Sequence, residues 1–415
     1  MADIPKIRFK GFTEPWEQRK LGDIAEFNKG SGYSKGDLVE SGTPIILYGR
    51  LYTKYETSIS EVDTYVKAKD GSVYSKGGEV IVPASGETAE DIARAATVDK
   101  SGVILGGDLN VVSPNEDINS AFLAISISHG NSQRQLAKKA QGKSVVHIHN
   151  EEIKNLVVPF PANAEQNKIV EYFSNLDHLI TLHQRKCDDT KELKKYMLQK
   201  MFPKNGEKFP EIRFKGFTEA WEQRKLEDFG KATGGTSIES EFSEDGVYKV
   251  ISIGSYSENS VYNDQGIRAI KSDKTSNRVL NRNDLTMILN DKTTSGNIIG
   301  RVLLIEESGI YVYNQRTERI EINLDEYDPV FLYEMLNAPN IREKIIKQAQ
   351  GNTQIYVNWT TISLLEYMIP SKEEQVKIGE HLYGISNLIA LHQRKCDTLK
   401  ELKKYMLQNM FPKKG

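Results

Sequence analysis

The chain has 415 residues, of which 38% are hydrophobic and 27% charged, and its formal net charge is −2. A chain of this length exceeds one hydrophobic core and predicts two or more domains. The balanced charge predicts no general electrostatic attraction to nucleic acid. The sequence has neither an apolar run long enough to span a membrane nor the apolar core of a signal peptide, so we expect neither a membrane span nor secretion. The two cysteines are equivalent positions of a repeat and not a disulfide framework, so a cytoplasmic protein is expected.

The chain opens with a short aromatic segment, residues 4–24, that recurs as residues 209–229 with 16 of 21 positions identical. Trp16 recurs as Trp221, and the letters EQRKL follow both. Several aromatic side chains at the start of a strand or turn favour packing against a neighbouring element. We therefore expect each of these heads to be a docking segment and not a catalytic loop.

Two middle segments follow the heads, residues 25–140 and 230–349, and they have little resemblance to each other. Short β-branched and aromatic runs, separated by Gly, Asn, Asp and Ser, predict strands with long loops. A helical pattern closes each middle, so we expect two α+β units. The predicted strands are 43–48, 78–82, 103–112, 247–253, 285–289, 298–305 and 309–322, and the predicted helices are 121–140 and 329–350.

After each middle lies a long segment, residues 165–202 and 374–411, that begins with Glu-Gln. Residues 176–206 and 385–415 share 23 of 31 positions. Apolar residues recur at spacings of three and four, which is typical of a helix, here about 55 Å long, packed on another helix. Two independent amphipathic helices are the other interpretation, but near-identical seams in one chain favour mutual packing. The predicted interface residues are Ile169, Tyr172, Leu176, Leu179, Leu193, Met197, Ile378, Ile385, Leu388, Leu399, Leu402 and Met406.

The chain is thus head, middle and long helix, written twice. The expected domains are residues 1–160 and 207–369, and the expected spacer helices are 161–206 and 370–415. Two like halves predict a pseudo-two-fold axis with the helices antiparallel. The expected fold is α+β, with two different globular domains separated by the helix pair. Such an arrangement fits a bipartite DNA target, because half-site spacing follows from protein geometry.

Several short sequences make this organisation specific. They are KLGDI after Trp16, EQxKI at 165–169 and 374–378, SGETAEDIAR at 85–94 and GNTQIYVNW at 351–359. In their order and duplication they resemble the specificity subunit of type I restriction-modification enzymes, over essentially the whole chain.

The resemblance implies that each middle is a target recognition domain for one half of an asymmetric, interrupted DNA sequence. The paired helices would set the gap between the halves. Two methylation subunits would bind around the helices and carry S-adenosylmethionine, and motor-nuclease subunits would join them with ATP and Mg. No cofactor is expected on this chain itself.

The sequence contains no catalytic motif that we recognise. An adenine methyltransferase needs an NPPY-like tetrapeptide, and the chain has no Pro-Pro pair. A P-loop needs a glycine where Ala137 precedes Gly142-Lys143-Ser144. Acidic residues near a lysine, such as Asp63 and Lys67, are better explained as solvated surface than as a nuclease site. We expect a non-catalytic subunit.

His183 and Cys187 lie one helical turn apart, and the second copy repeats them as His392 and Cys396. An antiparallel crossing could bring the four together as a zinc site. The alternative is that they pack in the seam and recur through duplication alone. We predict no metal site.

The loops of the middles supply the candidate DNA contacts. The segment 48–55, YGRLYTKY, interleaves basic and aromatic residues, and other loops offer amide and guanidinium groups suited to base edges. Each pattern is also typical of a solvated loop, and a scaffold that binds proteins through twin domains is the alternative function. The candidates are Tyr48, Arg50, Lys54, Ser85, Thr88, Arg94, Lys143, Ser144 and His147 in the first half, and Lys292, Thr293, Thr294, Asn314, Gln315, Arg316, Asn352, Thr353, Gln354 and Tyr356 in the second.

Overall fold

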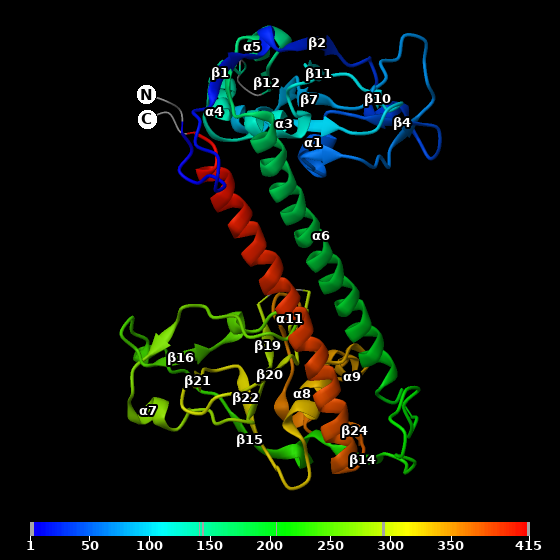
Figure 1. The fold of residues 1–415 in the computed structure, drawn as a ribbon. Helices are drawn as coiled ribbons and strands as arrows, with labels where there is room; N and C mark the ends of the chain where they lie inside the picture. The colour runs from blue at the N-terminus through cyan, green and yellow to red at the C-terminus, as the bar shows by residue number, and fades with distance from the viewer. Residues whose placement is uncertain (1–3, 141, 143–144, 205, 293–294, 413–415) are drawn as a thin grey trace. The chain divides into compact units, whose positions relative to one another are not determined.

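The computed structural model describes residues 4–140, 142, 145–204, 206–292 and 295–412. The chain divides into two compact units (Figure 1). Unit 1 is Met1–His183 with Lys395–Gly415, and unit 2 is Gln184–Arg394. Each unit therefore combines one middle segment with parts of both long helices.

Unit 1 is built on a five-stranded sheet in the order β2-β11-β7-β9-β5. β11 pairs antiparallel with both β2 and β7, and α3 packs on β7 and β9. The head strand β1 pairs antiparallel with β13, as expected for a docking segment. The strands are β1 (Glu17–Lys20), β2 (Ala25–Lys29), β3 (Leu38–Val39), β4 (Thr43–Ile46), β5 (Ser58–Ile59), β6 (Tyr65–Val66), β7 (Glu79–Pro83), β8 (Ser85–Gly86), β9 (Ala96–Val98), β10 (Ile104–Leu105), β11 (Leu109–Pro114), β12 (Val146–His147) and β13 (Val157–Phe160), and the helices are α1 (Arg50–Thr53), α2 (Ala89–Ile92), α3 (Ser120–Ser128), α4 (Gly130–Lys139) and α5 (Asn150–Lys154).

Unit 2 repeats this plan with a four-stranded sheet in the order β15-β22-β18-β20. The head strand β14 pairs with β24, as β1 does with β13. The strands are β14 (Glu222–Lys225), β15 (Gly230–Gly234), β16 (Tyr248–Ile251), β17 (Arg268–Ala269), β18 (Leu285–Ile288), β19 (Asn290–Asp291), β20 (Val302–Leu304), β21 (Tyr311–Tyr313), β22 (Thr317–Ile322), β23 (Ile355–Tyr356) and β24 (Glu366–Ile369), and the helices are α7 (Asp273–Ser276), α8 (Pro329–Asn337), α9 (Pro339–Ile346) and α10 (Trp359–Ile362).

The single helix predicted at the end of each middle is two helices in both units. In unit 1, His129 is extended between α3 and α4, and Gly130 has a φ of +67°, which glycine adopts readily. In unit 2, Ala338 is extended between α8 and α9 because the following Pro339 disfavours a helical conformation there. The helical patterns were recognised correctly, but both breaks were missed.

The two long helices, α6 (Asn163–Lys200) and α11 (Lys372–Asn409), have 38 residues each. Within unit 1 the start of α6 lies against the end of α11. Cys396 Sγ contacts the Ile180 carbonyl oxygen at 3.9 Å, and Lys403 pairs with Asp177 at 2.5 Å. The order of these contacts runs in opposite directions along the two helices. The segments that meet in unit 1 are therefore antiparallel, as predicted.

Unit 2 contains the complementary segments in the same arrangement. Cys187 Sγ contacts the Ile389 carbonyl oxygen at 3.8 Å. Lys194 Nζ donates to Ser386 Oγ at 2.6 Å and pairs with Glu334 of α8 at 2.8 Å. Here too, a higher residue number on α6 meets a lower one on α11, so these segments are antiparallel.

The inward face of each helix differs in part from the predicted one. Ile169, Leu176, Ile378 and Ile385 are buried, and Tyr172, Met197, Leu399 and Met406 are half-buried. By contrast, Leu179, Leu193, Leu388 and Leu402 are 40%, 45%, 50% and 39% exposed. The buried positions continue through Phe173 and Cys187, which lie on one side of the predicted stripe, and through the equivalent Leu382 and Cys396. The apolar stripe is wide, and the four leucines occupy its outer edge.

The Glu-Gln pair at the start of each long helix joins three parts of its unit. Arg8 of the head donates two hydrogen bonds of 2.7 Å to Glu165, whose side chain is 1% exposed. Gln166 accepts from the Asn119 backbone N–H and donates to the Pro161 carbonyl oxygen. Two adjacent side chains thus fasten the head and the middle to the helix.

Unit 2 has the same pair of contacts. Arg213 donates two hydrogen bonds of 2.7 Å to Glu374, and Gln375 accepts from the Asp328 backbone N–H. The repeated letters Glu-Gln therefore have a structural explanation in both copies.

The end of each long helix enters a set of aromatic side chains, which we call the socket. In unit 1, Phe411 lies 6.0 Å from Trp16 and 5.9 Å from Phe122, measured between ring centroids. In unit 2, Phe202 lies 6.4 Å from Trp221 and 5.8 Å from Phe331. These head tryptophans are buried, so the head aromatics pack as expected.

Replacing Glu165 with Ala is expected to destabilise unit 1 by roughly 1.5–3 kcal/mol, because it removes the carboxylate that accepts two hydrogen bonds from the half-buried Arg8 guanidinium. The free energy of unfolding from urea titration measures the effect. The matched control is Glu17→Ala, which removes one partner of the exposed Arg19–Glu17 pair. That pair is worth only about 0–1 kcal/mol. Equal losses in the two variants would contradict the role given to Glu165.

A fragment of residues 1–206 is expected to form a homodimer. It contains the Trp16–Phe122 socket and also Met201 and Phe202, which fill the equivalent socket of unit 2. Each copy can therefore fill the socket of the other, burying side chains worth about 1.5–3 kcal/mol each. Mass in solution by light scattering tests this, with Phe202→Ala as the weakened control. A monomeric, folded fragment would contradict it.

Candidate nucleic-acid interface

The predicted loops of unit 1 meet through a short two-stranded ladder. β8 and β12 pair antiparallel, which places His147 opposite Ser85. Ser85 Oγ and His147 Nδ1 are 3.1 Å apart, and the Tyr52 hydroxyl donates to the Ser85 carbonyl oxygen at 2.8 Å. Two segments about 60 residues apart and the α1 region thus come together at one point.

Several predicted cations of unit 1 have internal partners. Arg50 is 9% exposed and bonds to Asp63 and Glu56, each at 2.7 Å. Lys54 also pairs with Asp63, at 2.8 Å. Arg50 therefore braces the loop after α1. Tyr48, at the start of this segment, is 38% exposed and lies edge-on to Tyr52.

The segment after β8 is ordered by its own side chains. Thr88 caps α2 by accepting from the Asp91 backbone N–H at 3.0 Å. Arg94 donates to Asp91 and to the Leu51 carbonyl oxygen, and its guanidinium lies 5.3 Å from the Tyr55 ring centroid. These contacts connect α2 to α1 and hold the backbone beside Ser85.

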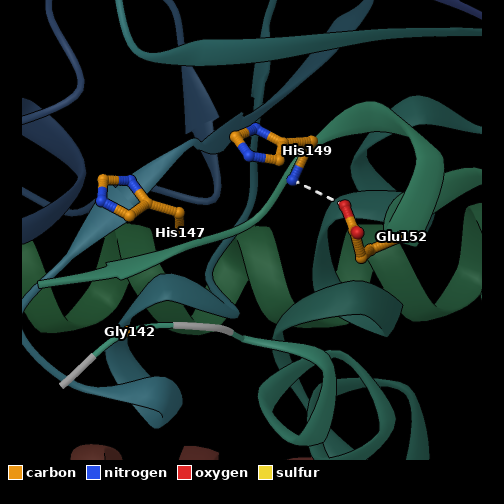
Figure 2. A pocket seen from close by; sticks show the side chains of 4 residues that line it. All are labelled: Gly142, His147, His149 and Glu152. Carbon is orange, nitrogen blue, oxygen red and sulfur yellow. Dashed lines mark hydrogen bonds between the residues drawn. The ribbon is translucent and has the colours of Figure 1, made fainter.

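An open pocket of about 500 Å³ lies at this ladder, lined by Gly142, His147, His149 and Glu152 (Figure 2). The two imidazole rings are nearly parallel, at 9°, with centroids 6.5 Å apart. They lie on one face because the backbone stays extended from His147, at the end of β12, to His149, and residues two apart in an extended chain point the same way. Glu152 accepts from the His149 backbone N–H at 2.9 Å. The pocket offers two exposed imidazoles as hydrogen-bonding groups.

Unit 2 builds the same ladder from its own loops. β19 and β23 pair antiparallel, with Asn290 opposite Tyr356. The Val357 backbone N–H donates to the Leu289 carbonyl oxygen at 2.9 Å, as the Ile148 N–H donates to Ala84 in unit 1 at 3.0 Å. The loop candidates of both units therefore meet at equivalent places, although their side chains differ.

The remaining candidates of unit 2 surround this ladder. Tyr356 is 37% exposed. Asn314 is buried, and its side-chain oxygen accepts from the Ile238 backbone N–H. Gln315 donates to Glu239 at 3.3 Å. The exposed candidates are Lys292, Gln315, Arg316, Asn352, Thr353 and Gln354. Lys143, Ser144, Thr293 and Thr294 lie outside the described residues.

Sequence reasoning missed Arg342, which supports the loop after β19. Its side chain is 8% exposed and donates to the carbonyl oxygens of Ile299 and Asn297 at 2.9 and 2.6 Å. Burial lowers the pKa of this guanidinium to about 10, within the range where it stays charged at neutral pH. Nothing in a helical pattern marks such an arginine as a loop brace. Tyr52 and His149 were missed too, although each lies near a candidate in the sequence.

Glu318 of β22 is a buried acid two residues beyond Arg316, and it is 5% exposed. Burial raises the pKa of its carboxyl to about 7, and the nearby charge of Arg278 opposes this only in part. The corresponding position on β11 of unit 1 is Asn110, a neutral side chain that donates to the Ile148 carbonyl oxygen.

Comparison with known protein families gives this geometry a context. A family model described as the type I restriction modification DNA specificity domain matches residues 13–191 and 218–401. The chain belongs to this family. The two matched stretches correspond to the two copies of the repeat, so each unit contains most of one specificity domain.

Two curated relatives come from Methanocaldococcus jannaschii. The type I restriction enzyme MjaVIII specificity subunit is 23% identical over 402 residues, covering 95% of this chain and 91% of the relative. The putative type I restriction enzyme MjaX specificity subunit is 23% identical over 425 residues, covering 98% and 95%.

Solved structures support the fold. The S subunit of a type I restriction-modification system from M. genitalium matches with a TM-score of 0.65 at 14% identity, covering 99% of this chain and 100% of that one. A chain from a study of assembly and conformational transition of the type I system matches with a TM-score of 0.53 at 15% identity, covering 95% and 97%. Two α+β domains with long packed helices are thus the architecture of this chain.

The repeated cysteines of the chain are buried in the helix seams. No group of three or more His, Cys, Asp or Glu within the described part of the chain is placed to share a metal ion. Among the described helices, none combines the length and apolarity of a membrane span.

Glu318 is expected to make unit 2 less stable as pH rises from about 4.5 to about 7. Across this range the unfolded carboxyl ionises while the buried one stays protonated, so the folded state binds more protons and loses relative stability. Glu318→Gln removes the change and is expected to be more stable at pH 8 by on the order of 2 kcal/mol. Urea unfolding at pH 5 and 8 measures this. If the original chain and the Glu318→Gln variant lost the same stability between pH 5 and 8, a group other than Glu318 would be responsible.

Proposed function

We propose that this chain is the DNA specificity subunit of a type I restriction-modification complex, and that each unit recognises one half of a bipartite, asymmetric target. The observation that carries the proposal is that the candidate loops of both units meet at equivalent backbone ladders, β8–β12 and β19–β23, while presenting different side chains. Equivalent positions give the two readers a common way of approaching DNA. Different side chains give each reader its own sequence.

Base recognition is assigned to the exposed residues around these ladders. His147 in unit 1, and Lys292, Arg316 and Tyr356 in unit 2, are exposed and offer side chains suited to base edges or phosphates. Arg50 and Arg94 have internal partners and serve to hold the loops.

The outer faces of α6 and α11 are the proposed docking surface for methylation subunits. Three pairs of equivalent apolar side chains remain exposed there: Leu179 and Leu388, Leu193 and Leu402, and Tyr196 and Tyr405. Tyr196 and Tyr405 are 49% and 56% exposed. A repeated apolar stripe on two related helices suits two copies of one partner.

Catalysis is assigned to the partners and not to this chain. S-adenosylmethionine would be held by the methylation subunits, and ATP and Mg by the motor-nuclease subunits. The specificity subunit positions the partners on DNA. Its two units would select the bases of the two half-sites, and its long helices would set the gap between them.

Inserting one heptad after Gln184 of α6 and another after Gln393 of α11, positions that face each other in the antiparallel pair, is expected to lengthen the unspecified gap. Seven residues preserve the 3.5-residue seam and add about 10 Å of helix, roughly three base pairs. The bases of both half-sites should stay unchanged. The measurement is a map of methylated sites after co-expression with the methylation partner, compared with that of the original chain.

Two other outcomes would count against the proposal. An inserted protein that methylates the original gap would overturn the role of the helices. An original complex that neither retains DNA by sequence nor methylates a bipartite site would favour the alternative of a protein-binding scaffold.

A further inference from the structure

One turn in unit 2 lies directly against the proposed recognition ladder. Residues 314–316 join β21 to β22, and the Leu289 backbone N–H donates to the Arg316 carbonyl oxygen at 2.9 Å. Leu289 immediately precedes β19, the strand paired with β23. The Gly235 N–H donates to the Thr317 carbonyl oxygen at 2.8 Å. The backbone of Arg316 is thereby fixed beside the ladder.

Unit 1 has the same turn in the same place. Asp108 precedes β11, and the Ala84 backbone N–H donates to its carbonyl oxygen at 2.7 Å. Ala84 immediately precedes β8, and the Gly30 N–H donates to the Leu109 carbonyl oxygen at 3.0 Å. Asp108 and Arg316 therefore occupy equivalent positions, although they are 208 residues apart in a chain whose loops differ in length.

Both residues have a backbone conformation that favours glycine. The φ angle is +57° at Asp108 and +70° at Arg316. A side chain at such an angle costs stability that glycine would avoid, more so for Arg than for Asp. Both side chains are nonetheless present and exposed. Their backbone bonds explain the turn but do not require either side chain.

The two side chains have opposite charge and are available to a ligand. No hydrogen bond or ion pair within the described residues engages the Arg316 guanidinium or the Asp108 carboxylate. Arg278 of unit 2 and Arg94 of unit 1 are by contrast engaged with protein atoms. One equivalent point thus carries a guanidinium fork in unit 2 and a carboxylate in unit 1.

We propose that this position determines one base in each half-site: Arg316 recognises a guanine, and Asp108 recognises a cytosine. A guanidinium donates two hydrogen bonds to O6 and N7 of guanine, and a carboxylate accepts from the N4 amino group of cytosine. This assignment rests on the proposed function and adds the residues and base types to it. The opposite charges would contribute to the asymmetry of the target.

The test is to measure methylation rates by the complete complex on duplexes that carry each of the four bases at every half-site position. Arg316→Gly is expected to reduce discrimination for guanine at one position by roughly 5- to 150-fold, in one half-site only. Asp108→Gly should do the same for cytosine in the other half-site. Both variants should melt at or above the temperature of the original, because glycine suits the backbone. A merely structural role would lower it.

Two matched controls separate base recognition from general charge effects. Arg282→Gln removes another exposed arginine of unit 2, and Asp70→Asn removes another exposed turn acid of unit 1. Both controls should leave every base preference unchanged. Arg316→Lys should keep most of the affinity but lose most of the guanine preference, because an ammonium lacks the fork.

Each outcome has one meaning. If the original complex methylates no sequence selectively, the proposed function fails. If it methylates a bipartite site but Arg316→Gly and Asp108→Gly leave all preferences unchanged, only this inference is overturned. A loss at both half-sites from either variant would also overturn it, since each residue is assigned to one half.

Discussion

The structure of both units depends on a buried ion pair at the first turn of a long helix. Glu165 is 1% exposed, and its carboxylate is bound by the fork of Arg8 at two points. Such a charge is tolerable only with a partner, and the helix N-terminus favours a negative group as well. Gln166 fastens the middle segment to the same turn. Because Glu374 and Gln375 make the same contacts in unit 2, each middle segment is attached to the first turn of a long helix, and these contacts place no constraint on the loops.

The helix seams of the two units share a backbone arrangement, but they neutralise a half-buried lysine in different ways. A lysine lies in each seam, and burying its charge requires an acid. Lys403 finds Asp177 on the neighbouring helix, whereas Lys194 meets Ser386 at the equivalent position and reaches Glu334 of α8 instead. The seams are thus alike in backbone arrangement and different in chemistry.

The sequence was sufficient for the duplication, the long antiparallel helices and the α+β middles, because repeats and heptads leave strong local patterns. The sequence did not show which apolar positions of the long helices face inward. Leu179 and Ile180 are both apolar, so either could have been the buried one. Lys194 is polar although it lies in the seam, which interrupts the apolar pattern there. Among the loops, residues 48–55 looked like a nucleic-acid segment, yet Arg50 is held by Asp63 and Glu56. Those partners lie further along the chain in no recognisable motif. Ladders of two residues, such as β8–β12, leave no periodic signal either.

The near-neutral charge of the chain is consistent with the proposed function. Phosphate contacts supply most of the affinity for DNA, whereas base contacts supply the selectivity. Many cations of the middles are neutralised by internal acids, as Lys69 is by Asp37 and Arg268 by Asp264. A protein with few unpaired cations is better suited to discriminating between base sequences than to binding the DNA backbone tightly. Phosphate binding would then fall largely to the methylation subunits, and selectivity would require the assembled complex, in which weak but discriminating base contacts act on DNA that the partners already retain.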